Sequence, residues 1–439
     1  MRGRGLIIAA PASGSGKTLV TFGLLRHLAQ SGIAAAAAKT GPDYIDPGFH
    51  TLASGAPCLN LDPWAMRPET LASHVAQLEQ TAEIVLCEGV MGLFDGTGTE
   101  GETGSTAELA RLTGWPVVLV VDARGQGASA AALLRGFVAH DPEVPIAGVV
   151  FNRVAGARHG ALLAAAVARH LPGLCVLGAV PMEAGLTLPS RHLGLVPAGE
   201  IAAAEALIAR AAAIAGASLD IARLLSLAQR SRHAGAPPQA TIPPLGTRIA
   251  VARDAAFGFA YPALFDGWRR SGAEIVFFSP LANEPPDPAA DAVYLPGGYP
   301  ELSAGRLAAA ETCFAGLRRA AQAGKSIYGE CGGYMALGRA LVDAEGRRHA
   351  MAGLLPLETG FAEPRRHLGY RAVHLLARGP LGPAGTGFRG HEFHYASIVA
   401  EDGFAPLFAA ADSCGHDLGA CGLRQGLVCG SFIHLIDRC

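Results

Sequence analysis

Short apolar runs alternate with helical patterns along most of the chain, as in parallel sheets with crossover helices. In the first half, the apolar runs lie at 6–10, 83–87, 116–121, 146–151 and 175–180. In the second half, comparable runs lie at 248–252, 274–278, 292–295 and 326–328. The later runs at 371–376, 391–399 and 426–432 follow one another without long helical patterns. The pattern therefore predicts an α/β fold with additional strands near the C-terminal end.

A segment rich in proline, glycine and polar residues divides the two alternating blocks at 228–246. A chain of 439 residues also exceeds the size of one ordinary hydrophobic core. We therefore predict two domains: an N-terminal phosphate-loop (P-loop) parallel-sheet domain at 1–230 and a C-terminal α/β domain at 247–439, joined by a linker at 231–246.

The composition permits sizeable cores and shows no marked charge. Half of the residues are hydrophobic, 16% are charged, and the formal net charge is -2. This balance argues against nucleic acid as a main partner. No run of about 18 apolar residues could span a membrane, and the N-terminus lacks the layout of a signal peptide. The alanine-rich stretch at 201–228 contains Glu205, Arg210 and Asp220, so we expect a soluble helical pair; a helix lying on a membrane surface is the alternative.

Nine cysteines are scattered along the chain, and none forms a Cys-x-x-Cys pair. An odd number without such pairs favours a cytoplasmic location over a disulfide framework. The tail cysteines Cys414, Cys421 and Cys429 fit no zinc spacing, so we interpret them as small buried residues.

The first candidate site lies where the run at 6–10 leads into a glycine-rich loop. Such a loop before a helix lets backbone N–H groups surround phosphate oxygens. Lys17 would reach the outer phosphates and Thr18 a magnesium ion, although Pro11 stands at the usual first glycine. A turn that only caps the helix is the alternative. The predicted ATP contacts are Ser13, Gly14, Ser15, Gly16, Lys17, Thr18 and, at the purine edge, Asn152.

Acidic residues cluster after two of the first-half runs. Glu88 directly follows the run at 83–87, where parallel sheets build their sites, and this position suits a magnesium ligand. A proline-stiffened stretch at 41–47 and a glycine-rich loop at 89–96 carry further carboxylates. Solvated loops are the alternative. The predicted metal ligands are Thr18, Asp43 and Glu88, and the predicted acceptor site comprises Asp43, Tyr44, Asp46 and Asp95.

The second candidate site lies after the run at 326–328, where Cys331 stands before two glycines. A cysteine on a strand-to-helix turn exposes its sulfur, and the thiolate is the nucleophile. Backbone N–H groups of Gly298 and Gly332 would then stabilise an oxyanion.

His434 is the predicted proton shuttle, and His391 and His394 are rival bases. A glutamate that commonly orients such a histidine two residues further on is absent, because Ile436 stands there. The sequence does not identify another residue for this task.

A phosphate loop activates a group with ATP, whereas a cysteine–histidine pair hydrolyses an amide. Together they predict an enzyme that takes ammonia from glutamine and attaches it to an ATP-activated carboxylate.

With these motifs in this order, the chain closely resembles the cobyrinic and hydrogenobyrinic acid a,c-diamide synthases of cobalamin biosynthesis over nearly its whole length. In this family the proline at position 11 and the missing glutamate are normal. The resemblance is carried by the stretches 10–18, 41–47, 88–96, 191–195, 251–257, 297–301, 329–333 and 390–395.

The resemblance implies a dethiobiotin-synthetase-like ATP domain followed by a triad-type, class I glutamine-amidotransferase-like domain. It implies a carbon–nitrogen ligase that amidates the a and c acetates of hydrogenobyrinic or cobyrinic acid, with L-glutamine, ATP and Mg2+. It places Asp43, Glu88 and Asp95 at the ATP–acceptor site and makes Cys331 and His434 the glutaminase pair.

Related functions remain open at this stage. A nickel-sirohydrochlorin a,c-diamide synthase shares most of the motifs, and cobyric acid synthase is usually longer. A ParA-like partitioning ATPase is an alternative of another class, but its activity would not require the cysteine turn. The alanine- and glycine-rich composition indicates a genome of high GC content. This favours the metal-free substrate of the aerobic pathway, hydrogenobyrinic acid, over cobalt-containing cobyrinic acid. The sequence leaves undetermined the order of the two amidations, the ammonia path and whether the protein is a homodimer.

Overall fold

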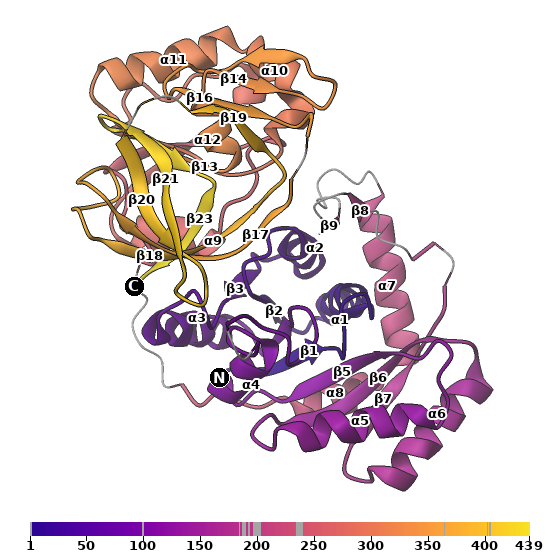
Figure 1. The fold of residues 1–439 in the computed structure, drawn as a ribbon. Coiled ribbons are helices and arrows are strands. Elements are labelled where there is room, and N and C mark those ends of the chain that lie inside the picture. Colours follow the sequence, from indigo (N-terminus) through magenta and orange to yellow (C-terminus); the bar gives the residue numbers. More distant parts are fainter. Residues whose placement is uncertain are drawn as a thin grey trace. The chain divides into compact units, whose positions relative to one another are not determined.

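The computed structural model describes residues 2–98, 101–183, 185–186, 190–191, 194–195, 203–233, 240–363, 365–401, 403 and 405–439. The chain forms two compact units, shown in Figure 1. The first comprises Met1–Trp64 with Pro68–Pro238, and the second comprises Ala65–Arg67 with Gln239–Cys439. Residues 234–239 of the predicted linker lie outside the described residues. Both units are α/β, which confirms the predicted fold class.

The first unit is built on a parallel seven-stranded sheet in the order β3-β2-β4-β1-β5-β6-β7. Its strands are β1 (Arg4–Ala9), β2 (Ala35–Thr40), β3 (Leu59–Leu61), β4 (Ile84–Glu88), β5 (Val117–Asp122), β6 (Ile146–Val154) and β7 (Cys175–Pro181). Its helices are α1 (Lys17–Gln30), α2 (Ile45–Ser54), α3 (Pro68–Thr81), α4 (Thr106–Thr113), α5 (Ser129–His140), α6 (Ala157–His170), α7 (Ala204–Ser218) and α8 (Ile221–Leu227). A short pair, β8 (Ser190–Arg191) and β9 (Gly194–Leu195), completes the described elements of this unit.

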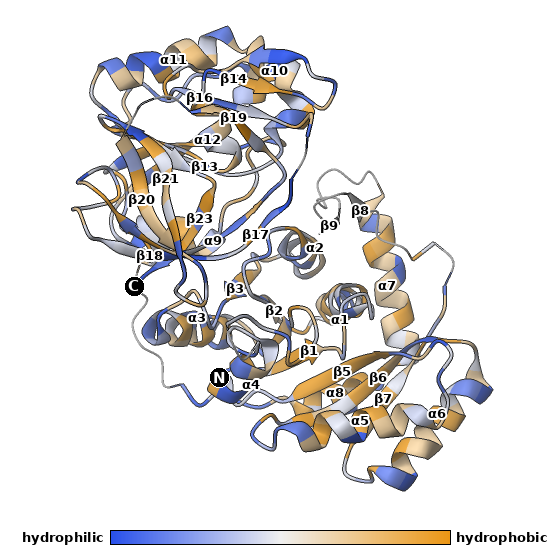
Figure 2. Cartoon of the chain, in the orientation of Figure 1, coloured by the Kyte–Doolittle hydropathy of each residue, from blue (hydrophilic) through white to orange (hydrophobic). Residues whose placement is uncertain are grey.

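Helices cover both faces of this sheet, with α5 and α6 on one side and α1 and α7 on the other (Figure 1). The middle of the central strand β1 is accordingly apolar, and its residues Leu6, Ile7 and Ile8 are completely buried. The strands β5 and β6 are correspondingly coloured as hydrophobic in Figure 2. This burial explains why the parallel strands appear in the sequence as continuous apolar runs.

The alanine-rich stretch forms the predicted pair of helices, α7 and α8. Gly23 of α1 allows close packing against α7, since a Cβ at this position would lie 2.8 Å from the Ala211 carbonyl oxygen. Among the described residues, no helix is long and apolar enough to cross a membrane.

The second unit contains a ten-stranded sheet in the order β11-β10-β12-β13-β22-β21-β20-β17-β18-β23. Neighbours from β11 to β22 run parallel, and those from β22 to β23 run antiparallel. The strands are β10 (Arg248–Ala252), β11 (Glu274–Phe278), β12 (Ala292–Leu295), β13 (Ser326–Glu330), β17 (His367–Leu375), β18 (Gly387–His394), β20 (Ala405–Ala411), β21 (Asp417–Gln425), β22 (Val428–Ser431) and β23 (Ile433–Arg438).

A smaller sheet of four strands accompanies it, in the order β15-β14-β16-β19. These strands are β14 (Ala340–Val342), β15 (Arg348–Ala350), β16 (Leu357–Gly360) and β19 (Ser397–Glu401). The helices of this unit are α9 (Pro262–Arg270), α10 (Ala304–Ala308), α11 (Glu311–Gln322) and α12 (Gly332–Leu337), with 3-10 turns η2 (Pro280–Ala282) and η3 (Pro300–Ser303).

The prediction of one strand over 391–399 is wrong. β18 ends at His394 and β19 begins at Ser397, and the two strands belong to different sheets. β18 pairs with β17 and β23, whereas β19 pairs with β16. The break depends on which strands are available as partners, and the local alternation of residues does not mark it.

Candidate active sites

The phosphate loop connects β1 to α1 and adopts a backbone that requires glycine. Gly14 and Gly16 have φ values of 78° and 95°. A Cβ on Gly16 would lie 2.2 Å from Asn152 Nδ2, so a larger residue would displace the Asn152 amide. Asn152 Nδ2 donates to the Ser15 carbonyl (2.8 Å), and Arg153 Nη1 donates to the Gly14 carbonyl (2.8 Å). The loop is therefore held by residues of β6.

Asn152 is predicted to contact a purine edge, and the structure places it beneath the phosphate loop. Both polar atoms of its amide have partners within the chain, because Oδ1 accepts from the backbone N–H of Arg153 (2.9 Å). The purine contact stays a prediction. Of the other predicted loop contacts, Ser13 and Gly14 are exposed, whereas Ser15 and Lys17 are buried.

Glu88 is the centre of a buried polar cluster at the end of β4. Thr18 Oγ1 donates to Glu88 Oε1 (2.7 Å), and His50 Nε2 lies 2.6 Å from Oε2. Lys39 Nζ lies 3.6 Å from Oε1. Burial by itself would raise the pKa of Glu88, but Lys39, His50 and Thr18 outweigh it and lower the pKa to about 2. The carboxylate is therefore ionised and held close to the start of α1.

Two buried lysines face this cluster. Lys17 Nζ donates to the Met91 carbonyl (2.6 Å), and burial lowers the pKa of its ammonium. Lys39 Nζ donates to the Gly89 carbonyl (2.9 Å) and lies 3.1 Å from Asp46 Oδ2. Burial opposes the charge of Lys39, yet Glu88 and Asp46 raise its pKa overall. The site thus contains two positive groups suited to phosphate oxygens.

The predicted acceptor residues lie around the same end of the sheet. Asp43 accepts from the backbone N–H groups of Ile45 (2.9 Å) and Asp46 (3.4 Å) at the start of α2. Burial raises the pKa of Asp46, and the charges of Asp43 and Glu88 raise it further. Asp95 is exposed and accepts from the backbone N–H of Gly92 (2.9 Å).

Electrostatics links these residues to the phosphate loop. The charges of Glu88, Asp46 and Asp95 all act on the Lys17 ammonium and favour its charged form. Tyr44 is half-buried at the start of α2, next to Asp43. The structure therefore brings Asp46, Glu88 and Asp95 into the neighbourhood of Lys17.

Sequence reasoning assigned no role to Lys39 or His50. Their exposed fractions are 3% and 0%, respectively. A lysine inside an otherwise alanine-rich strand is a signal that could have been used, because lysine is rarely buried unless paired. His50 lies within α2, and nothing in the local sequence distinguishes it from a core residue.

The second site is built on a strained turn between β13 and α12. The backbone of Cys331 has φ 47° and ψ -103°, a conformation that residues other than glycine rarely adopt. Such a strained backbone is typical of turns that carry a catalytic nucleophile. The backbone N–H of Cys331 donates to the Ser431 carbonyl (2.8 Å) on β22. A Cβ on Gly333 would lie 2.0 Å from the Leu295 carbonyl oxygen, so the turn packs directly against the end of β12.

The predicted oxyanion donors and the predicted base meet at this turn. A Cβ on Gly332 would lie 3.0 Å from the Gly298 nitrogen, and one on Gly297 would lie 2.2 Å from His434 Cε1. The imidazole of His434 therefore lies against the loop that carries Gly298. Burial lowers the pKa of His434 to about 3 and raises the pKa of the Cys331 thiol.

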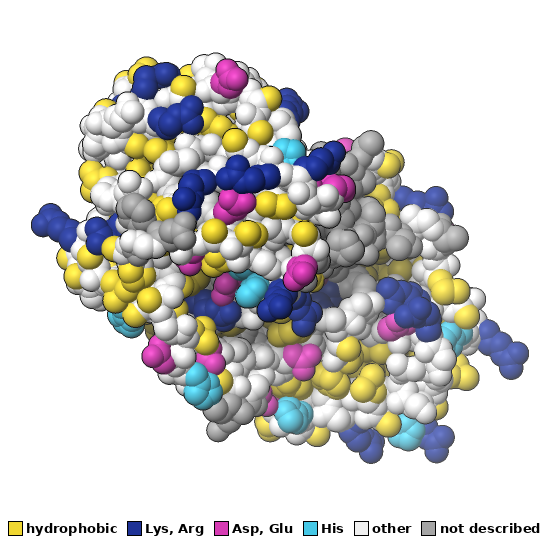
Figure 3. All heavy atoms as spheres, turned by 45° about the horizontal axis from the view of Figure 1, so that its top comes forward, with side chains coloured by type: hydrophobic (Ala, Val, Ile, Leu, Met, Phe, Trp, Pro, Cys, Tyr) yellow, Lys and Arg dark blue, Asp and Glu magenta, His cyan; other side chains and the backbone are white. Residues whose placement is uncertain are grey.

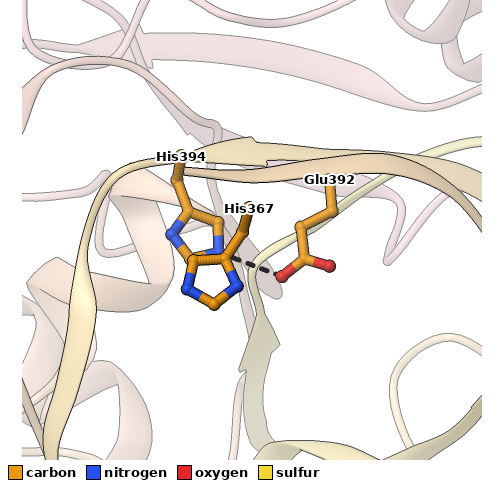
Figure 4. Close-up of side chains that lie close together, drawn as sticks. All are labelled: His367, Glu392 and His394. Atoms are coloured by element: carbon orange, nitrogen blue, oxygen red, sulfur yellow. Dashed lines mark hydrogen bonds and ion pairs between the residues drawn. The ribbon is translucent and has the colours of Figure 1, made fainter. Parts of the chain in front are cut away.

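The rival bases lie on β18, next to the strand of His434. His391 is the register partner of His434. Figure 4 shows His394 beside Glu392, with His394 Nε2 3.0 Å from Glu392 Oε1. His394 Nδ1 lies 3.1 Å from the Ala396 carbonyl oxygen. Both ring nitrogens of His394 thus have partners within the chain, which disfavours His394 as the base.

A cavity of about 600 Å³ opens beside His394, and its lining includes Arg365, His367, Glu392 and Phe432. The imidazoles of His367 and His394 lie close enough to Glu392 to suggest a metal site. However, their rings stack at 4.7 Å with an angle of 9°, so their in-plane lone pairs do not converge. This geometry fits ring stacking better than metal binding. Arg371 Nε also occupies Glu392 Oε2 at 2.7 Å.

The interpretation of the tail cysteines as buried residues is wrong for Cys414, which is exposed, and incomplete for Cys421, which is half-buried. Cys429 is buried as predicted. Cys414 lies in the turn before β21. Charged side chains of both signs are mixed over the face in Figure 3, in keeping with the net charge of -2.

Comparison with known proteins finds a matching domain family for each half of the chain. Residues 6–196 match the model of the CobQ/CobB/MinD/ParA nucleotide binding domain, and residues 248–438 match the CobB/CobQ-like glutamine amidotransferase domain. Within the resembling stretch at 191–195, positions 192 and 193 lie outside the described residues.

Similar proteins extend over the full chain. A hydrogenobyrinate a,c-diamide synthase of Brucella anthropi is 52% identical over 441 residues, covering 99% of both chains. Proteins with the same name from Rhizobium meliloti (50% identity, 99% of both chains) and Rhodobacter capsulatus (52%, 99% of this chain and 98% of the relative) are comparably similar. The chain therefore belongs to the family of cobyrinic and hydrogenobyrinic acid a,c-diamide synthases.

Proposed function

We propose that this protein amidates the a and c acetate carboxylates of hydrogenobyrinic acid, with ATP as the energy source and glutamine as the nitrogen donor. The observation that carries the proposal is the full-length similarity, at about half of all positions, to relatives of that name. The phosphate loop and the cysteine turn supply the two half-reactions that this chemistry needs. The nine scattered cysteines support a cytoplasmic location.

In the first half-reaction, an acetate oxygen attacks the γ-phosphorus of ATP and releases ADP, leaving an acyl phosphate. The loop N–H groups and Lys17 bind the phosphates, and Lys39 adds positive charge. The hard oxygens of Thr18 and Glu88 suit Mg2+, with Asp43 as a further ligand. When bound, Mg2+ would neutralise charge on the phosphate oxygens. Asp46, Tyr44 and Asp95 would face the acceptor.

In the second half-reaction, Cys331 Sγ attacks the side-chain amide carbon of glutamine. His434 takes the thiol proton and passes it to the leaving nitrogen, while the N–H groups of Gly298 and Gly332 stabilise the oxyanion. Ammonia leaves, and water hydrolyses the thioester to glutamate. Ammonia then displaces phosphate from the acyl phosphate and forms the amide. One ATP and one glutamine are consumed for each acetate.

The alternatives differ in the acceptor. Cobyrinic acid carries cobalt but presents the same peripheral acetates, and nickel-sirohydrochlorin presents comparable ones. A partitioning ATPase is disfavoured because it would leave the amidotransferase domain at 248–438 without a purpose.

The test is to incubate the protein with MgATP, glutamine and each acid separately, and to count the added amides by mass. Two amides on hydrogenobyrinic acid support the proposal. Four amides would indicate cobyric acid synthase, and none on either corrinoid acid would direct the assay to nickel-sirohydrochlorin.

The division of labour can be tested with Cys331→Ala. This variant should lose glutamine-dependent synthesis and keep synthesis with free ammonia. Cys313→Ala removes another buried thiol of the same unit and is the matched control. A failure of ammonia to rescue Cys331→Ala would contradict the assignment.

A further inference from the structure

The glutaminase site lacks a carboxylate at the position where such sites commonly have one. Ile436 lies two residues after His434 on β23 and is 4% exposed, so it packs as a core residue. A histidine that receives a proton from a thiol becomes an imidazolium, and burial makes that charge costly without a counter-charge.

Glu330, the residue before the nucleophile, presents its carboxylate to the same imidazole. Its Oε2 lies 3.9 Å from His434 Nδ1, and both side chains are 3% exposed. Glu330 Oε1 accepts from the backbone N–H of Leu435 (3.2 Å), the neighbour of His434 on β23. Oε2 also accepts from the Tyr294 hydroxyl (2.8 Å). The carboxylate is thus fixed from β12 and β23 at once.

We propose that Glu330 is the positioning residue of His434, supplying from the last residue of β13 the carboxylate that position 436 lacks. This inference rests on the proposed glutaminase function. The separation of 3.9 Å is an ion-pair distance and too long for a hydrogen bond. Such contacts commonly tighten when substrate binds. The carboxylate would orient the ring and stabilise the imidazolium formed when Cys331 loses its proton.

The other charged groups around His434 are less suited to orient its ring and stabilise its imidazolium. β18 presents His391, Glu392 and His394 to it. The charge of Glu392 also acts on His434, but Arg371 and His394 already occupy the two oxygens of Glu392. The donors to Glu330, from Tyr294 and Leu435, are uncharged.

Among the described residues, His434 is the group able to carry positive charge within 4.0 Å of Glu330. On the thiol side, Glu301 and Glu392 face Cys331 together with Glu330. The charge of an ionised Cys331 therefore depends on His434 for compensation, and His434 in turn depends on Glu330.

The test compares Glu330→Gln with wild type in four measurements: glutamine hydrolysis, ammonia-dependent synthesis, KM for glutamine, and the pH dependence of Cys331 alkylation by iodoacetamide. We expect the kcat for glutamine hydrolysis to fall by about 10²-fold or more, the range of general acid–base contributions. Ammonia-dependent synthesis and KM should stay close to wild type. Alkylation should shift to higher pH, because the thiolate–imidazolium pair loses its counter-charge.

Two further variants sharpen the result. Glu330→Asp keeps the charge and should recover part of the hydrolysis. Glu358→Gln makes the same chemical change on β16, where Glu358 pairs with Arg348, and should leave all four measurements unchanged. Unchanged hydrolysis and alkylation in Glu330→Gln would overturn the inference, and so would equal losses of the glutamine- and ammonia-dependent activities.

If Glu330→Gln does not fold, Tyr294→Phe carries the test, since it removes one donor to Glu330 and keeps the charge. We expect a milder loss of hydrolysis and a displaced pH profile of alkylation, and a wild-type profile would overturn the inference. If the wild-type protein hydrolyses no glutamine at all, the proposed function fails, and that outcome is distinct from a failure of Glu330.

Discussion

Thr18 Oγ1 donates a hydrogen bond of 2.7 Å to Glu88 Oε1 and thereby joins the phosphate loop to the end of β4. The contact follows from the topology, because β1 and β4 are parallel neighbours with Ile8 opposite Glu88. The carboxyl ends of both strands therefore lie at the same edge of the sheet. The phosphate-binding loop and an acidic strand end meet there although they lie far apart in the sequence.

Glu88→Gln should abolish synthesis with either nitrogen donor. The change keeps the shape but removes the charge that Thr18, His50 and Lys39 surround, and with it the proposed magnesium ligand. We expect ammonia-dependent kcat to fall by at least about 10²-fold and the Mg2+ requirement to rise about 10- to 100-fold. Glutamine hydrolysis by itself should persist.

The measurement is synthesis rate against Mg2+ concentration, with exposed Glu143→Gln as the control. Wild-type synthesis by Glu88→Gln at ordinary Mg2+ would contradict the assignment.

Gly16→Ala should damage ATP binding far more than Gly14→Ala. Both glycines have positive φ, which costs an alanine about 1–2 kcal/mol. Only Gly16 also meets a neighbour, since a Cβ would lie 2.2 Å from Asn152 Nδ2, whereas the space at Gly14 is open. We expect the KM for ATP in ammonia-dependent synthesis to rise by about 10-fold more in Gly16→Ala. Adding Asn152→Ala should recover part of the loss, and equal effects of the two glycine variants would refute this account.

His434→Asn should lower glutamine-dependent kcat by about 10²-fold or more, because it removes the proton shuttle. His391→Asn changes the register partner on β18 and should retain most of the activity. Both variants should use free ammonia normally. Steady-state assays with each nitrogen donor decide between the two histidines, and a greater loss in His391→Asn would reverse the assignment.

Glu330 should make the second unit less stable as pH rises. Burial raises the pKa of Glu330 from its ordinary 4.5 to about 7. The folded state therefore binds the carboxyl proton of Glu330 more tightly than the unfolded state does. The stability that this proton contributes is complete below pH 4.5 and is lost as the pH rises through 7, at a cost of about 3 kcal/mol.

Glu330→Gln should therefore raise Tm relative to wild type at a pH of about 8.5, by several degrees, and not at about pH 5. Burial lowers the pKa of His434, so this residue changes stability with pH in the opposite direction. That effect is present in both proteins and drops out of their Tm difference at a given pH. Thermal unfolding at both pH values is the measurement, and an equal Tm difference at both would exclude a raised pKa of Glu330. A gain in stability together with a loss of hydrolysis would also separate a functional role from a structural one.

Much of the fold could be predicted from the sequence because its signals are local. Continuous apolar runs mark buried parallel strands such as β5 and β10, and the runs at 248–252 and 274–278 coincide with β10 and β11. Gly14 and Gly16 mark a tight turn before Lys17 because their positive φ favours glycine. Gly332 and Gly333 mark the turn after Cys331 because a Cβ there would lie too close to neighbouring atoms. The boundary between β18 and β19 could not be predicted in this way. The sequence pattern over 391–399 is continuous, and the strand is divided only because its two parts pair with strands of different sheets.

The sequence by itself determined the α/β class, the two reactive turns and the residues at their tips, since each depends on neighbours within one strand–turn–helix segment. The tertiary structure decided the groups that set their charge: Lys39 and His50 around Glu88, and Glu330 beside His434. Leu435 and Glu330 are 105 positions apart, and five strands separate β13 from β23 in the order of the ten-stranded sheet, so only the three-dimensional fold brings them together. Electrostatic effects act through space, and the distances between these groups exist only once the sheets have formed.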